Sequence, residues 1–322
     1  MLPNTKKFRI DCLNWIYCLI IVTRNYGYEI DGTVIMQATI KNTNFVRIIS
    51  CLLLLFGNAC SDASQPHEKS ENKSEVISEI FRYAQACENG EALSCHELGA
   101  LYHKGNEVTQ DYDKADSLYT QACEDGNAPS CTNLGILYSK TDGVTKDYDK
   151  ARQLYTKGCD GDDMLGCTNL GFIYHGGLSV TQDYATAAGF FAQACDGMNM
   201  LGCTNLGYAY KKGDGVEQNY VRAGELFNQA CDGRSMVGCT AFGVLHLRGN
   251  GVPKDYAKAA SLFTQSCDGG DMFGCNNLGN LYLSGAGVEQ DKKAGVGLLK
   301  QACDRGNQLG CNKLKKLARG YN

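Results

Sequence analysis

The stretch Cys123-Glu-Asp-Gly-Asn-Ala-Pro-Ser-Cys131-Thr-Asn-Leu-Gly-Ile-Leu-Tyr138 carries the pattern that decides the fold. Its two cysteines stand eight positions apart, and the same pair returns every 36 residues along the chain. The first cysteines of these pairs are Cys87, Cys123, Cys159, Cys195, Cys231, Cys267 and Cys303, and the second are Cys95, Cys131, Cys167, Cys203, Cys239, Cys275 and Cys311. Because fourteen of the 18 cysteines follow this one rule, the sequence predicts a chain built from internal repeats.

Each 36-residue period contains two amphipathic helical patterns. After a predicted N-cap at Asp147, the residues Ala151, Leu154 and Tyr155 have the i, i+3, i+4 spacing of one helix face. The helix that starts at the second cysteine has the same spacing, in Leu134, Leu137 and Tyr138. The repeats contain no alternating runs of β-branched residues that would indicate strands. We therefore expect an all-α solenoid of seven units over residues 74–322, in which each hairpin buries its apolar face against the next.

A glycine recurs in the middle of the helix that follows the second cysteine, at Gly99, Gly135, Gly171, Gly207, Gly243 and Gly279. A glycine inside a helix costs roughly 1 kcal/mol relative to alanine, so its recurrence needs a structural reason. Only a very small residue lets neighbouring backbones approach closely, and the glycine column therefore predicts a close helix crossing.

The cysteine pairs flank loops rich in aspartate and glycine, where one helix ends and the next begins. A turn of this length can bring the two Cα atoms within the about 4.4–6.8 Å that a disulfide requires. Zinc sites use shorter C-x2-4-C spacings, and reduced core cysteines would conflict with the export signal described below. We predict one local disulfide per repeat: Cys87–Cys95, Cys123–Cys131, Cys159–Cys167, Cys195–Cys203, Cys231–Cys239, Cys267–Cys275 and Cys303–Cys311. Closing each loop of about nine residues should contribute roughly 2.5 kcal/mol to stability.

The amino-terminal region has the features of a secretory signal peptide. Lys41 and Arg47 precede or open an apolar run over 45–56, and the small residues Gly57 and Ala59 follow it. A membrane span needs about 20 apolar residues, and this run stops after roughly nine. We predict that 36–59 is the signal peptide, that Met36 is the true start, and that 1–35 is an overlong gene start.

Cys60 follows these small residues directly and opens a polar stretch, which we predict to be a linker over 60–73. The arrangement resembles a bacterial lipoprotein processing site, where the first mature cysteine is lipidated. Gly57 departs from the leucine that this pattern prefers, so cleavage by ordinary signal peptidase after Ala59 is the alternative. We expect an exported protein that is secreted, periplasmic or an outer-envelope lipoprotein, attached to a membrane only through Cys60.

The charge balance excludes nucleic acid as a ligand. The whole chain has a formal net charge of −4, and from residue 60 onward 25 basic residues stand against 32 acidic ones, which gives −7. A nucleic-acid groove needs a basic stripe that replaces the counterions of the phosphates, and the sequence contains none. We also expect a monomer without a cofactor or a metal ion.

The segments Leu134–Tyr138, Asp142–Val144 and Asp147–Ala151 resemble Sel1-like repeats, which are relatives of tetratricopeptide repeats. With a cysteine pair in every repeat, the resemblance narrows to the Helicobacter cysteine-rich protein family. This resemblance implies a right-handed α/α superhelix with a concave inner face. It also implies a secreted protein that binds penicillin and hydrolyses β-lactams, and that takes part in host interaction.

The sequence supplies no catalytic site for β-lactam hydrolysis. Its S-x-x-K string, Ser70 to Lys73, falls in the predicted linker, and neither S-D-N nor K-T-G accompanies it. His96, Glu97 and His103 are the one local concentration of metal-binding residue types, and a helix would turn both histidines to nearly the same face. Single histidines on a polar helix face are the stronger interpretation of this cluster. The sequence therefore identifies no catalytic residue.

A column of asparagines offers a binding surface instead. It consists of Asn133, Asn169, Asn205 and Asn277, and it is broken at Ala241 and Lys313. In tetratricopeptide-like solenoids the helix that carries this column lines the concave face, and an asparagine amide can both donate to and accept from a peptide backbone. The alternative is that these amides satisfy backbone groups between stacked helices.

We therefore predict a scaffold that binds a protein or peptide in its concave groove. A β-lactam-binding protein or weak β-lactamase is the alternative, because a groove for peptidoglycan peptides could also accept a penicillin. A third candidate is a relative of the oxidase-assembly proteins of the mitochondrial intermembrane space. The apolar leader argues against it, because a mitochondrial leader should be amphipathic and rich in arginine.

Overall fold

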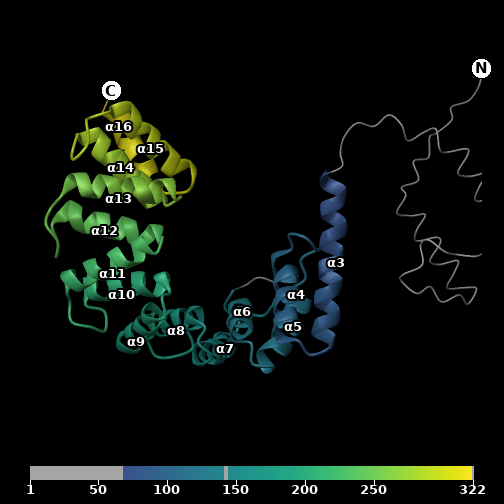
Figure 1. The fold of residues 1–322 in the computed structure, drawn as a ribbon. Helices are drawn as coiled ribbons and strands as arrows, with labels where there is room; N and C mark the ends of the chain where they lie inside the picture. The colour runs from purple at the N-terminus through teal and green to yellow at the C-terminus, as the bar shows by residue number, and fades with distance from the viewer. Residues whose placement is uncertain (1–67, 141–143, 321–322) are drawn as a thin grey trace, which may run out of the picture. The chain divides into compact units, whose positions relative to one another are not determined.

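The computed structural model describes residues 68–140 and 144–320, and this part of the chain is entirely helical (Figure 1). The helices are α3 (Glu68–Glu88), α4 (Ala92–Lys104), α5 (Tyr112–Glu124), α6 (Ala128–Ser139), α7 (Tyr148–Asp160), α8 (Met164–Gly176), α9 (Tyr184–Asp196), α10 (Met200–Lys212), α11 (Tyr220–Asp232), α12 (Met236–Arg248), α13 (Tyr256–Asp268), α14 (Met272–Ser284), α15 (Lys292–Asp304) and α16 (Gln308–Arg319). The predicted gene start, signal peptide and lipidation site at Cys60 lie outside these residues.

The predicted linker ends earlier than expected, because α3 begins at Glu68 and takes in six residues that we assigned to it. The stretch is polar, but glutamate and lysine are good helix formers, and polar composition alone does not prevent a helix. Ser70 and Lys73 of the S-x-x-K string therefore lie in the first two turns of a helix rather than in a linker.

From Ser70 onward the chain forms one compact unit of stacked helical hairpins. Every helix from α4 to α16 packs against its neighbours in the chain, and the first helices of successive repeats also touch, as α6, α8, α10, α12 and α14 do. Packing is therefore between nearest neighbours throughout, which confirms the predicted all-α solenoid. No helix in the described ranges is long and apolar enough to cross a membrane.

All seven predicted disulfides are present. Their Cα atoms are 4.4–4.7 Å apart, within the range that a disulfide requires. Each bond joins the end of one helix to the start of the next, as in Cys195 of α9 and Cys203 of α10. Both of these cysteines are buried, so the disulfides form part of the core as well as closing the turns.

The recurring glycines mark close packing, although the neighbour differs from the one we expected. A Cβ on Gly207 would lie 2.6 Å from Cε1 of Phe227, and one on Gly135 would lie 2.7 Å from Cε1 of Tyr155. The glycine thus makes room for an aromatic ring of the following helix rather than for its backbone. Only in the sixth repeat is the nearest atom a backbone one, the carbonyl oxygen of Gly295 at 2.9 Å from a Cβ on Gly279.

Side-chain caps begin almost every helix. The predicted N-cap Asp147 accepts a hydrogen bond from the Lys150 amide at 2.9 Å, which confirms that assignment. The same column caps the other second helices, through Asp111, Asp183, Asn219, Asp255 and Asp291. The first helices from α6 onward are capped by Asn127, Asp163, Asn199, Ser235, Asp271 and Asn307.

A buried polar ladder joins consecutive repeats through these caps. The Thr204 hydroxyl of α10 lies 3.1 Å from the Ser235 hydroxyl that caps α12, and the Thr168 hydroxyl of α8 donates to the Asn199 side chain at 3.2 Å. Thr240 makes the same contact with the Asp271 carboxylate. Each bond connects a threonine to a residue 31 positions later, so the ladder sets the register of one repeat on the next.

Candidate ligand-binding face

The four predicted asparagines occupy one position on α6, α8, α10 and α14, and each is half-buried. Two of them are hydrogen bonded within their own helix. The Asn205 side-chain nitrogen donates to the Leu201 carbonyl at 2.7 Å, and the Asn277 side-chain oxygen accepts from the Asn276 side chain at 3.3 Å. Donation by Asn205 leaves its side-chain oxygen available as an acceptor.

The other two asparagines differ from this pattern. Asn133 is hydrogen bonded to the hydroxyl of Tyr119, a buried residue whose pKa is raised by burial. The side-chain nitrogen of Asn169 is shielded from solvent and has no hydrogen-bond partner. A buried donor without a partner is costly, typically by about 1–3 kcal/mol, so the Asn169 amide is the member of the column most in need of an acceptor.

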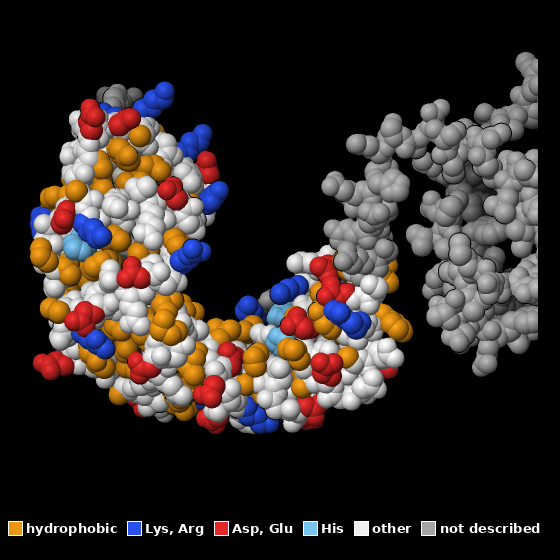
Figure 2. Space-filling model, viewed as in Figure 1, with side chains coloured by type: hydrophobic (Ala, Val, Ile, Leu, Met, Phe, Trp, Pro, Cys, Tyr) orange, Lys and Arg blue, Asp and Glu red, His pale blue; other side chains and the backbone are white. Residues whose placement is uncertain are grey.

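An apolar column lies one helical turn before the asparagines. Its exposed members Leu93, Leu201, Val237, Phe273 and Leu309 are spaced by multiples of 36 residues, and each is between 43% and 58% exposed. The two positions between Leu93 and Leu201 hold Pro129 and the partly buried Leu165. Figure 2 shows apolar side chains exposed among charged ones over the stacked helices. Since single exposed apolar residues are ordinary, the informative feature here is their repetition on one face of successive helices.

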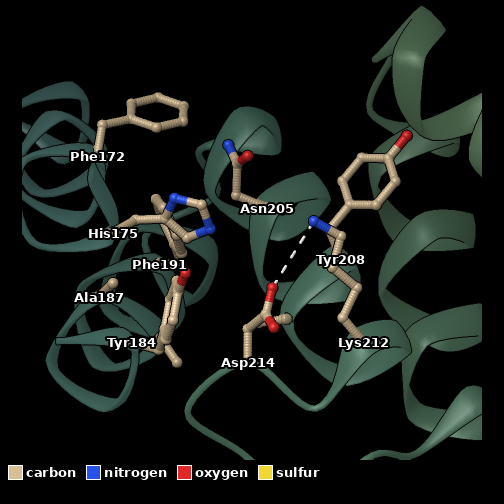
Figure 3. Close-up of a pocket in the computed structure, with 11 residues that line it drawn as sticks. Phe172, His175, Tyr184, Ala187, Phe191, Asn205, Tyr208, Lys212 and Asp214 are labelled. Carbon is tan, nitrogen blue, oxygen red and sulfur yellow. Dashed lines mark ion pairs between the residues drawn. The ribbon is translucent and has the colours of Figure 1, made fainter. Parts of the chain in front are cut away.

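A cavity of about 140 Å³ opens on this face at the junction of the third and fourth repeats. Its walls are aromatic and come from three helices: Phe172 and His175 of α8, Tyr184 and Phe191 of α9, and Tyr208 of α10. Figure 3 shows the Asn205 amide between the rings of Phe172 and Tyr208 in this view, with the His175 imidazole below. We call this cavity the aromatic pocket.

Cationic side chains surround one side of the aromatic pocket. The Lys212 ammonium lies 3.7 Å from the Asp214 carboxylate, an ion pair marked in Figure 3. Lys211 is half-buried, and its ammonium lies 5.2 Å from the centre of the Tyr208 ring. Burial lowers the pKa of Lys211, and the positive charges of Arg248 and Lys212 lower it further. Three cations therefore stand near Asp214, and a second carboxylate, Asp271, adds to the effect of burial in raising the pKa of Tyr208.

His96 and His103 lie on one face of α4, as the helical spacing predicts. The rings of His96 and His103 both face Tyr119, with ring centres 5.8 and 6.0 Å from the tyrosine ring. His96 stands at the position that holds threonine in the next four repeats, and it is hydrogen bonded at 2.8 Å to the hydroxyl of Ser130, inside α6, rather than to the cap Asn127. Within the described residues, no three His, Cys, Asp or Glu side chains are grouped so that they could hold a metal ion.

Sequence reasoning missed the aromatic pocket. Its signal is the position three residues after the asparagine column, which holds Ala100, Ile136, Phe172, Tyr208, Val244 and Asn280. The two aromatic residues stand in consecutive repeats, and stacking places them on either side of one junction. The pocket thus arises where this variable position holds an aromatic residue in two consecutive repeats. Because we looked in the sequence for residues that recur in every repeat, we missed this position.

Comparison with known proteins gives consistent matches to one kind of repeat. A model described as the Sel1 repeat matches residues 92–127, 128–163, 165–197, 201–235, 237–271 and 273–307. A protective antigen of uropathogenic Escherichia coli strains, which displays an SLR fold, is 33% identical with a TM-score of 0.64. That match covers 72% of this chain and 50% of the antigen, so the chain spans about half of that relative's length.

Two further solved structures are similar. A Sel1 repeat protein from Oxalobacter formigenes is 20% identical with a TM-score of 0.65, and the match covers 73% of this chain and 99% of that protein. Cysteine rich protein B of Helicobacter pylori is 30% identical with a TM-score of 0.34, over 42% of this chain and 97% of its own. No curated protein sequence matches the chain.

Proposed function

Since the chain belongs to the Sel1 repeat family, we propose that it is an exported scaffold that binds a protein or peptide along the face of its first helices. The observation that carries this proposal is the pairing of two columns on that face, one of half-buried asparagines and one of exposed apolar residues. An extended peptide presents both backbone amides and side chains. The asparagine column can hydrogen bond to its backbone amides, and the apolar column can pack against its apolar side chains.

Export is supported by the disulfide in every repeat. Such bonds form and persist in oxidising compartments and are rare in the cytosol, so they suggest an exported environment. The Escherichia coli relative is a protective antigen, and this also favours a place outside the cytoplasm. Within this proposal, Cys60 anchors the protein by a lipid or cleavage after Ala59 releases it, and the scaffold acts as a monomer.

The asparagine column is tested by a double substitution, Asn169→Ala with Asn205→Ala, in the oxidised protein. Peptides selected from a random phage-displayed library on the wild-type protein serve as ligands, and fluorescence anisotropy measures their affinity. Losing two amide contacts should weaken binding by about tenfold or more, given roughly 0.5–1.5 kcal/mol for each hydrogen bond.

The matched control is Asn228→Ala, which removes an exposed asparagine from α11, a second helix outside the column. We expect this variant to bind like the wild type. Unchanged affinity in the double variant, together with a lowered unfolding midpoint, would show that the column only supports the stack of helices.

β-Lactam binding or hydrolysis stays the alternative that the resemblance to the Helicobacter cysteine-rich proteins implies. A serine enzyme would need an activated hydroxyl held in fixed geometry, and we identify no such constellation among the described residues. The test is nitrocefin hydrolysis by the purified, oxidised chain. Turnover that scales with protein and disappears on substitution of one serine or histidine would establish the enzyme, and we expect none.

A further inference from the structure

We propose that the aromatic pocket is the anchor site for an aromatic side chain of the bound peptide, and that an acidic residue follows this side chain. The inference rests on the proposed scaffold function and deepens it, because it assigns one site on the face and the chemistry of its ligand.

The size of the pocket fits one aromatic ring. A cavity of about 150 Å³ lined by apolar side chains accommodates benzene, and the aromatic pocket measures about 140 Å³. Its walls already contain rings in edge-to-face contact, Phe172 with Phe191 at 5.5 Å and His175 with Tyr184 at 5.1 Å between ring centres. A further ring can pack against these edges and faces in the geometry that aromatic pairs prefer.

The Asn205 side chain orients a peptide at the mouth of the pocket. Its nitrogen is engaged with the Leu201 carbonyl, so its oxygen is the atom left to accept a hydrogen bond from a ligand. A backbone N–H next to the anchoring residue is a suitable donor, because each residue of an extended peptide other than proline offers one. The same lining therefore recognises a ring and a peptide group together.

The charges beside the pocket select an acidic neighbour. Lys212 is directed toward the pocket, and its ion pair with Asp214 is long at 3.7 Å. Lys211 and Arg248 add two positive charges nearby, so three cations stand against the carboxylates of Asp214 and Asp271, and the local balance is cationic although the chain as a whole is acidic. A carboxylate on the peptide would relieve the repulsion among these cations, whereas a lysine or arginine would add to it.

The next junction along the stack lacks this combination. The positions that correspond to Asn205 and Tyr208 hold Ala241 and Val244, and the position of Asp214 holds Asn250. The junction of α10 and α12 therefore does not repeat the site, and the chain itself supplies a matched control one repeat away.

The experiment measures fluorescence anisotropy of a labelled, carboxy-amidated peptide, Gly-Ser-Gly-Phe-Asp-Gly-Ser, with the full oxidised chain. Its comparison peptides replace the phenylalanine by alanine or the aspartate by lysine. We expect either replacement to weaken binding, the first by about tenfold, which is typical for loss of an aromatic anchor. Amidation removes the terminal carboxylate, so the acidic side chain is the only source of negative charge.

Variants of the protein locate the site. Tyr208→Ala should weaken the Phe-Asp peptide about tenfold, and Lys212→Gln should weaken it a few-fold and reduce the dependence of affinity on salt. The control Val244→Ala changes the equivalent position of α12 and should leave affinity unchanged. Adding Ala241→Asn with Val244→Tyr should build a second site and raise the binding stoichiometry.

Three results would overturn the inference: no measurable binding of the Phe-Asp peptide, equal binding of the three peptides, or unchanged affinity in a folded Tyr208→Ala variant. The proposed scaffold function is judged separately by the phage-selected peptides. If their binding depends on Asn169 but not on Tyr208, the scaffold function stands and the assignment of the aromatic pocket fails.

Discussion

At the scale of single residues, the glycines in the middle of the first helices leave no room for a larger side chain unless a neighbour moves. Gly207 shows why, because the ring of Phe227 that covers it is fully buried and packed on both sides. Protein interiors are packed as densely as organic crystals, so a ring in this position has no free space to move into. Gly207 weakens its own helix, but it allows the Phe227 ring to pack closely against that helix.

Replacing this glycine gives the first prediction. Gly207→Ala places a methyl group 2.6 Å from the Phe227 ring, and the strain should lower the free energy of unfolding by about 1–3 kcal/mol in urea titrations. Gly189→Ala is the control on α9, because a Cβ there meets nothing within 4 Å. It should stabilise the protein by up to about 1 kcal/mol through helix propensity. Equal effects of the two substitutions would contradict the packing explanation.

His96 gives a second prediction at this scale, one that depends on pH. Burial lowers the pKa of His96 below its ordinary value of about 6.5, although Glu97 and Asp163 oppose the shift. As pH falls through about 6.5 the unfolded chain takes up the proton first, so stability decreases with decreasing pH. His96→Thr introduces the threonine found at this position in the next four repeats and should reduce the loss between pH 7 and 5. Parallel loss in variant and wild type, measured by urea midpoints, would refute this role.

At the scale of helices and hairpins, the polar ladder is what fixes one repeat on the next. Apolar faces alone allow neighbouring hairpins to slide, whereas a hydrogen bond between a buried threonine and a cap specifies one register. The ladder also links two requirements, because the side-chain oxygen of Asn199 accepts both from the Gly202 amide that it caps and from the Thr168 hydroxyl of the preceding repeat.

Thr204→Val tests the ladder with little change in shape. It removes both the bond to Ser235 and the bond of the Thr204 hydroxyl to the Met200 carbonyl of its own helix, and it should destabilise the protein by about 1–2 kcal/mol because the half-buried Ser235 hydroxyl loses its partner in the preceding repeat. Thr264→Val is the control, because the exposed Thr264 hydroxyl bonds only within its own helix, to Ala260. Chemical denaturation of both variants provides the measurement, and a smaller loss for Thr204→Val than for Thr264→Val would contradict the ladder.

Much of this level of structure could be predicted from the sequence, because helix spacing, caps and cysteine pairs act over a few residues. The N-cap at Asp147 and the disulfides are examples that the structure confirms. The ladder could not be predicted, because Thr204 meets Ser235 only once the repeats are stacked. The predicted end of the linker at residue 73 was wrong, because we took polar composition to indicate a linker where α3 begins at Glu68. The aromatic pocket could not be predicted, because its walls come from three helices that meet only after stacking.

At the scale of the whole molecule, the chain is a row of hairpins, each closed by its own disulfide and held by its neighbours. The family match and the fold agree with this description, and they confirm the resemblance to Sel1-like repeats. Stability should then be a sum over hairpins and interfaces rather than the property of one core. The aromatic pocket, which has cations beside it in an otherwise acidic chain, distinguishes the junction of α8 and α10 from the next junction along the stack.

Peptide mapping under non-reducing conditions, on protein recovered from its native exported fraction, tests the central claim most directly. If each hairpin is closed locally, mass spectrometry will recover the seven pairs within repeats, such as Cys123 linked to Cys131, and no free thiol among these fourteen cysteines. Free thiols at these positions, or bonds between different repeats, would contradict both the arrangement of the hairpins and the oxidising environment inferred from it.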